Sequence, residues 1–185
     1  MDFTLIRSKR KTISLQVKGD EIVVRAPMRA SQKAIIAFVD SHRDWIEKQK
    51  KKEEEKNKRL SAVQPLSQEE VKALALAAKE YFPPVIRRYA SMMHIEYGKV
   101  TIRCQKSRWG SCSTKKNLNF NCLLMLAPEE VRESVVVHEL CHLKEMNHSH
   151  RFYEEVYRYC PDYDRLNVWL RENGPCILQR AFPKA

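Results

Sequence analysis

Two histidines one helical turn apart, with a glutamate beside the first, have the types and spacing needed for metal-assisted hydrolysis. The residues His138-Glu139-Leu140-Cys141-His142 have the form H-E-x-x-H. Side chains four residues apart share one face of a helix, so both imidazoles can reach one zinc ion with bonds of about 2.0–2.1 Å. Glu139 lies beside the same face and can take a proton from a water molecule on the metal. The pattern predicts a zinc-dependent hydrolase with Glu139 as its catalytic base.

A catalytic zinc site needs a third protein ligand as well as an open coordination position. His148 follows His138 by ten residues, which is the spacing of the H-E-x-x-H-x-x-G-x-x-H pattern, although Glu145 stands where that pattern has glycine. The chain must turn before His148, and Asn147 can provide a left-handed turn. His150 is the rival third ligand. We favour His148 and expect one zinc ion per chain.

The motif lies in a segment that is apolar on more than one face, with three valines at 135–137. Pro128 and the acids at 129–130 favour a helix start ahead of it. We expect this helix to be central and buried on most sides. Upstream, residues 100–104 and 118–124 have the composition of strands that flank a polar, basic connection. A small antiparallel sheet beside the helix is therefore predicted, and with it an α+β fold.

The beginning of the chain predicts a small unit of its own. Residues 12–17 and 22–26 alternate between apolar and polar side chains, as the strands of a β-hairpin with one wet face do. The residues between them, 18–21, suit a turn. Ser31 suits the N-cap of a helix that reaches Ile46, and we expect that helix to cover the hairpin.

A charged stretch at 47–59 predicts a solvated helical connector. We therefore expect a β-hairpin and helix unit over 1–60 and a catalytic domain over 61–185. The second is expected to open with a helix that begins at a capping box on Ser67. The prolines at 83–84 are expected to break that helix.

Residues 108–112, with the sequence Arg-Trp-Gly-Ser-Cys, form a second unusual cluster. The chain has only four glycines, so Gly110 indicates a backbone need such as a bulge or the close approach of another chain segment. One interpretation is a tight turn with Trp109 in the core. The other is an edge strand, formed by this cluster or by 118–124, that pairs with an extended peptide beside the metal.

The net charge of +11 is concentrated near the start of the chain, where residues 1–60 hold 16 Lys and Arg against nine Asp and Glu. This bias suits an anionic partner such as nucleic acid, and it serves solubility equally well. The chain has no long apolar run, which excludes a membrane span, and its N-terminus does not resemble a signal peptide. A cytoplasmic location is expected, and the six cysteines, with no C-x-x-C pair, are expected to be reduced.

Six short stretches, spread over nearly the whole chain, match the motifs of one known family. They are Arg10-Lys11-Thr12-Ile13-Ser14-Leu15, Val24-Arg25-Ala26-Pro27, Ser107-Arg108-Trp109-Gly110-Ser111-Cys112, Val136-Val137-His138-Glu139-Leu140-Cys141-His142-Leu143, Asn147-His148-Ser149 and Pro161-Asp162-Tyr163. In these stretches the chain resembles the YgjP-like metallopeptidase family of bacterial zincin-like proteins. The resemblance implies a zincin-like domain in which His138, His142 and His148 bind zinc and Glu139 is the base. One departure, tyrosine at 153 where the family usually has tryptophan, concerns packing after the third ligand.

The leading functional prediction is a zinc metallopeptidase that cleaves a peptide or protein substrate. Arg108, Tyr153 and Tyr163 are candidates for stabilising the oxyanion. One alternative is a metal-dependent hydrolase of nucleotide phosphoanhydrides, motivated by the positive charge and by the basic residues within 103–116. The other is a nucleic-acid-associated module similar to SprT-like proteases, which would bind through the basic N-terminal third.

Overall fold

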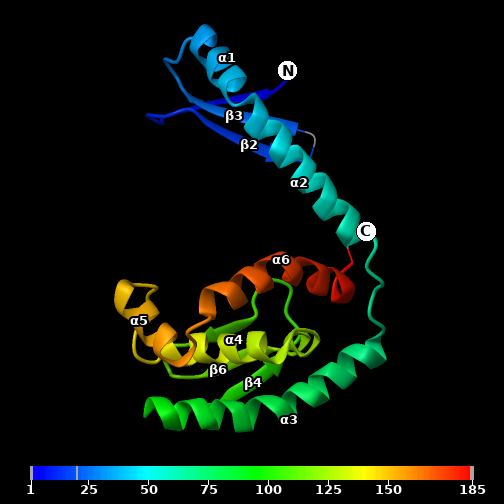
Figure 1. Cartoon of the computed structure of the whole chain (residues 1–185), viewed down its shortest axis with the longest axis vertical. Helices are drawn as coiled ribbons and strands as arrows, with labels where there is room; N and C mark the ends of the chain where they lie inside the picture. The colour runs from blue at the N-terminus through cyan, green and yellow to red at the C-terminus, as the bar shows by residue number, and fades with distance from the viewer. Residues whose placement is uncertain (1, 20, 184–185) are drawn as a thin grey trace. The chain divides into compact units, whose positions relative to one another are not determined.

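The chain forms two compact units, Met1–Ala62 and Val63–Ala185, each of which has a hydrophobic core of its own (Figure 1). This computed structural model describes residues 2–19 and 21–183. Asp20, in the turn predicted at 18–21, lies outside the described residues. Helices and small sheets are combined as the α+β prediction requires. No helix in the described ranges is both long enough and apolar enough to span a bilayer.

The first unit consists of three strands followed by two helices: β1 (Thr4–Ser8), β2 (Ser14–Lys18), β3 (Glu21–Pro27), α1 (Gln32–Ser41) and α2 (Arg43–Ser61). The predicted hairpin is confirmed, because β2 and β3 pair antiparallel. The strand β1 was not predicted; it pairs parallel with β3 and makes the sheet order β1-β3-β2. All five residues of β1 are exposed, so this strand lacks a clear buried face.

The helices cover one face of this sheet, as predicted. Ile22 and Val24 of β3 pack in one core with Ile35 of α1 and Ile46 of α2. The side chain of Ser31 caps α1 by accepting a hydrogen bond from the backbone of the first turn. The single predicted helix is interrupted at residue 42, after which the charged connector continues as α2.

The second unit is built around one helix. Its elements are α3 (Gln68–Met93), β4 (Val100–Arg103), β5 (Gly110–Cys112), β6 (Leu118–Asn121), the 3-10 helix η1 (Cys122–Leu126), α4 (Glu129–Cys141), α5 (His150–Tyr159) and α6 (Tyr163–Ala181). The helix α4 contacts α3, α5, α6 and β5. It is buried on most sides, as the apolar sequence around the motif predicts.

The expected break in α3 is wrong. The capping box at Ser67 is present, but the helix runs through both Pro83 and Pro84 to Met93. A proline inside a helix costs about 3 kcal/mol, because it removes a backbone hydrogen bond and crowds the preceding turn. Buried apolar side chains on both sides of the prolines, Phe82 and Ile86 among them, contribute about 1.5–3 kcal/mol each. Tertiary packing therefore holds the helix together where local sequence disfavours it.

The sheet of the second unit has the order β4-β6-β5 and is mixed, whereas an antiparallel sheet was expected. The strand β6 pairs parallel with β4 and antiparallel with β5. The long connection from β4 to β6 makes the parallel pairing possible, because it crosses over and inserts β5 on the way. The predicted strand 118–124 ends at Asn121, whose side chain caps η1 by accepting a hydrogen bond from Leu123 N–H. In the order β4-β6-β5, the segment at 110–112 lies at one edge of the sheet and β6 lies at its centre.

Candidate metal centre

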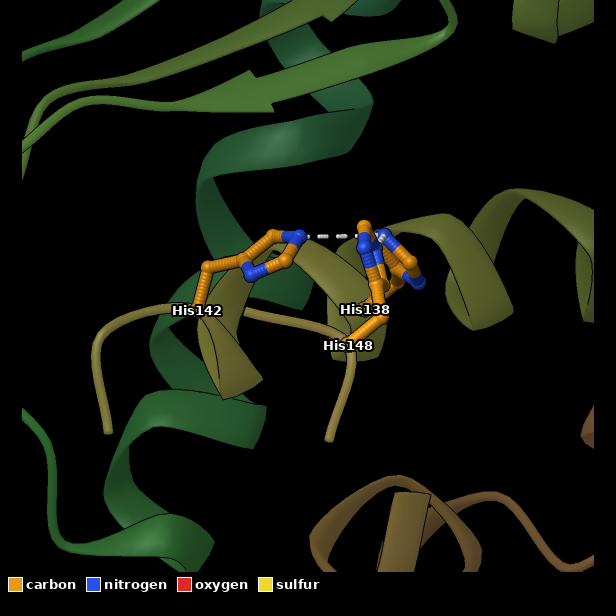
Figure 2. A group of neighbouring side chains, drawn as sticks. All are labelled: His138, His142 and His148. Atoms are coloured by element: carbon orange, nitrogen blue, oxygen red, sulfur yellow. Dashed lines mark hydrogen bonds between the residues drawn. The ribbon is translucent and has the colours of Figure 1, made fainter. Parts of the chain in front are cut away.

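Three imidazole rings converge at the C-terminal end of α4. His138 lies on α4, His142 is the C-cap of that helix, and His148 lies in the loop before α5. The Nε2 atom of His138 is 3.2 Å from the Nε2 atoms of both other histidines. Figure 2 shows the three rings turned toward one another. Among the described residues, these three form a group whose ligand atoms all lie within 4.8 Å of one another.

The rival histidine lies outside this group. His150 is the first residue of α5, and its side chain is 89% exposed and 3.3 Å from Glu154. The turn that brings His148 back is not the predicted one, because Asn147 has no positive φ. The chain leaves α4 through a tightened turn, in which Leu143 N–H donates to the Leu140 carbonyl at 3.0 Å.

The donor set and spacing of the three rings fit a divalent metal ion. Tetrahedral bonds of about 2.0–2.1 Å place two ligand nitrogens about 3.3 Å apart, close to the 3.2 Å between His138 and His142. His142 must donate from Nδ1 to the Glu145 carbonyl, 3.2 Å away, because a carbonyl oxygen only accepts. The Nε2 lone pair of His142 is therefore free. Burial, together with His142 and His148, lowers the pKa of His138 to about 3, so this ring is neutral at neutral pH, which is the form in which an imidazole can bind a metal.

Glu139 of α4 is buried against the edge strand β5, with only 5% of its surface exposed. A Cβ atom on Gly110 would lie 2.5 Å from Oε1 and 2.6 Å from Cγ of Glu139. The close approach predicted for Gly110 is thus the approach of this carboxylate to β5. Burial raises the pKa of Glu139 to about 8, while Arg108 lowers it. A divalent cation nearby would also favour the charged carboxylate.

Two aromatic residues support the histidine rings. The hydroxyl of Tyr163, the first residue of α6, lies 2.7 Å from Nδ1 of His138. This oxygen can accept the Nδ1 proton and so leave Nε2 of His138 free for a metal. Phe152 is fully buried, and its ring centre lies 4.6 to 5.0 Å from the centres of all three imidazoles. Ser149 fixes Phe152 by capping α5, since its hydroxyl accepts the Phe152 N–H.

The sequence pointed to Tyr163 only as an oxyanion candidate and through the stretch at 161–163. Its contact with His138 indicates a different task, which is to orient a ring that can bind metal. Tyr153, another oxyanion candidate, has its ring centre 6.3 Å from that of His148. The sequence around Tyr163 gives no local signal for its contact with His138, because the two residues are 25 positions apart.

We predict that Tyr163→Phe weakens Zn²⁺ binding roughly 10–100-fold, because His138 loses the hydrogen bond that orients it. Competition of the purified protein with a chromogenic chelator measures this affinity. Tyr157→Phe is the matched control, since the Tyr157 hydroxyl bonds to Asp164 at 3.0 Å and does not contact the histidines. Equal affinities of the two variants would contradict the assigned role of Tyr163.

Comparisons with known proteins find similarity to metallopeptidases. The family model described as YgjP-like, metallopeptidase domain, matches residues 11–75 and 68–173. Among solved structures, the metallopeptidase zymogen jannalysin of Methanocaldococcus jannaschii is similar, with 24% identity and a TM-score of 0.44 over 49% of this chain and 93% of that chain. The metallopeptidase zymogen abylysin of Pyrococcus abyssi has 23% identity and a TM-score of 0.42 over 48% and 94%. No curated protein matches the chain.

The family match extends over most of the chain and includes the whole of α4 and the loop that follows it. The chain therefore belongs to the YgjP-like metallopeptidase domain family and is a metal-dependent hydrolase of the peptidase class.

Proposed function

We propose that the chain is a zinc peptidase in which His138, His142 and His148 hold the metal and Glu139 is the catalytic base. The observation that carries this proposal is the position of Glu139, buried on the same helix as two of the histidines and pressed against Gly110 of the edge strand. Three imidazole donors without a thiolate suit zinc. When bound, zinc lowers the pKa of a water molecule and polarises a peptide carbonyl.

Glu139 supplies the proton transfers of the reaction. Its carboxylate accepts a proton from the attacking water and later gives that proton to the leaving amine. Burial helps the first transfer, because it raises the pKa of Glu139 to about 8 and so makes its carboxylate a stronger base. The close packing against Gly110 restricts where the carboxylate can lie. Glu139 is therefore held in one position for both transfers.

The edge strand β5 offers a place for the substrate backbone. One side of β5 pairs with β6, through Gly110 opposite Phe120 and Cys112 opposite Leu118. Its other side pairs with no strand in the described part of the second unit. An extended peptide can add to such an edge through main-chain hydrogen bonds, which hold it without regard to its sequence. The substrate would then pass directly beside Glu139.

We predict that Glu139→Gln keeps its bound zinc and loses peptide cleavage by roughly 10²–10⁴-fold, because glutamine cannot accept a proton. Cleavage is measured by mass spectrometry on a library of unstructured peptides, and zinc by elemental analysis. Glu129→Gln, an exposed change on the same helix, is the matched control and is expected to retain activity. A Glu139→Gln protein as active as this control would rule out the proposed base.

Gly110→Ala is expected to keep the zinc but to lower cleavage about 100-fold, because the added methyl group displaces the Glu139 carboxylate. The neighbouring change Ser111→Ala removes a hydroxyl from the same strand without adding atoms near Glu139. Both variants are assayed on one peptide that the native protein cleaves. If Gly110→Ala were no slower than Ser111→Ala, the close contact would have no role in catalysis.

A further inference from the structure

A cavity of about 230 Å³ lies beside Glu139, between the segment that leads into β5 and the helices α4 and α6. Trp109, Val135 and Leu170 give it apolar walls, and Ser107, Arg108 and Asn167 add polar groups. Its volume is below the range of about 300–1,000 Å³ that is usual for whole small-molecule ligands. The cavity therefore has room for about one amino-acid residue.

Arg108 is the cation in the lining of this cavity, where Glu139 is the anion. Within the described residues, the Arg108 guanidinium makes no hydrogen bond or ion pair, although it is near enough to Glu139 to influence its charge. A guanidinium is always charged and presents a planar fork that matches a carboxylate. With a divalent cation at the histidines, the positive charges around the cavity outweigh the single charge of Glu139.

The backbone that carries Arg108 is held in place by Asn121, a fully buried residue of β6. The Asn121 side chain donates to the carbonyls of Gln105 at 2.8 Å and Arg108 at 2.9 Å. Its backbone N–H donates to the Trp109 carbonyl at 2.8 Å. The segment from 105 to 109 is thus tied to the central strand at both ends. The backbone of Arg108 is therefore held in place at the cavity, and its guanidinium is available to a ligand.

Glu139 also indicates which part of a substrate occupies the cavity. If Glu139 hands its proton to the leaving amine, the residue that contributes this amine must lie next to Glu139. That residue is the one that follows the cleaved bond. The cavity is adjacent to Glu139 and the size of one residue, so it suits the side chain or chain end at this position.

We propose that the cavity selects substrates with a carboxylate on the residue after the cleaved bond, and that Arg108 determines this specificity by pairing with the carboxylate. The proposal rests on the peptidase function proposed above. The carboxylate has two possible sources, an aspartate or glutamate side chain and the free C-terminus of a peptide that ends there. Trp109, Val135 and Leu170 would contact the apolar part of the same residue.

The test uses the zinc-loaded full chain and four matched peptides derived from one cleaved sequence. Two are internal substrates with glutamate or glutamine after the cleaved bond and an amidated end. The other two end at that position, with leucine carrying either a free carboxylate or an amide. We expect kcat/KM to be roughly tenfold to 100-fold higher for the carboxylate member of at least one pair. The pair that shows the difference identifies the source.

Arg108→Ala is expected to abolish this preference, and Arg108→Lys to retain part of it, because lysine keeps the charge but loses the fork. Arg87→Ala removes an exposed arginine of α3 from the same unit and is expected to keep the full preference. Circular dichroism and zinc content verify that each variant is folded and loaded.

Three results would overturn the proposal, and each has a distinct meaning. If the native protein cleaves both members of each pair equally fast, the carboxylate specificity is wrong, while the proposed peptidase function is retained. An equal loss on all four peptides in Arg108→Ala would show that Arg108 acts on atoms common to every substrate and does not set specificity. A zinc-loaded native protein that cleaves no peptide of a broad library would remove the peptidase function and this inference together.

Discussion

The burial of polar side chains on α4 is the constraint on which the rest of the second unit depends. Burying an imidazole or a carboxylate without partners costs roughly 1–3 kcal/mol or more per group. Hydrogen bonds from neighbouring residues offset much of that cost. The Tyr163 hydroxyl bonds to Nδ1 of His138, and the Glu145 carbonyl accepts from Nδ1 of His142. Gly110 provides the space for Glu139. These neighbours do not bind the Nε2 atoms of the three histidines, which face one another. A metal ion is the natural partner of these three atoms.

Much of this arrangement could be predicted, because the decisive signals are local. The H-E-x-x-H spacing, the apolar valines around it and the caps at Ser31 and Ser67 all act within one or two helical turns. The predicted family and the α+β class are confirmed. The grouping of His148 with the motif histidines follows from the loop before α5, while the assignment of these residues as zinc ligands stays a prediction.

What the sequence did not indicate depends on contacts between distant segments. An edge strand at 108–112 was one of two interpretations, because the three residues of β5 are too few to show a period. The strand β1 was not predicted, because it has no buried face. Prolines disfavour a helix locally, but packing across the unit keeps α3 helical through Pro83 and Pro84. Gly174 of α6 is a further example, since a Cβ there would lie 2.9 Å from the Trp109 ring. The expected anionic or nucleic-acid partner of the basic N-terminal third also stays a prediction, because charge alone does not identify a surface.

The central claim is that His148 completes the metal site and His150 does not. The most direct test is elemental analysis of the native protein, His148→Ala and His150→Ala after reconstitution with zinc and removal of the excess. We expect about one zinc per native chain, an unchanged content in His150→Ala and a clear loss in His148→Ala. A native protein without zinc, or a loss in His150→Ala with full zinc in His148→Ala, would contradict it.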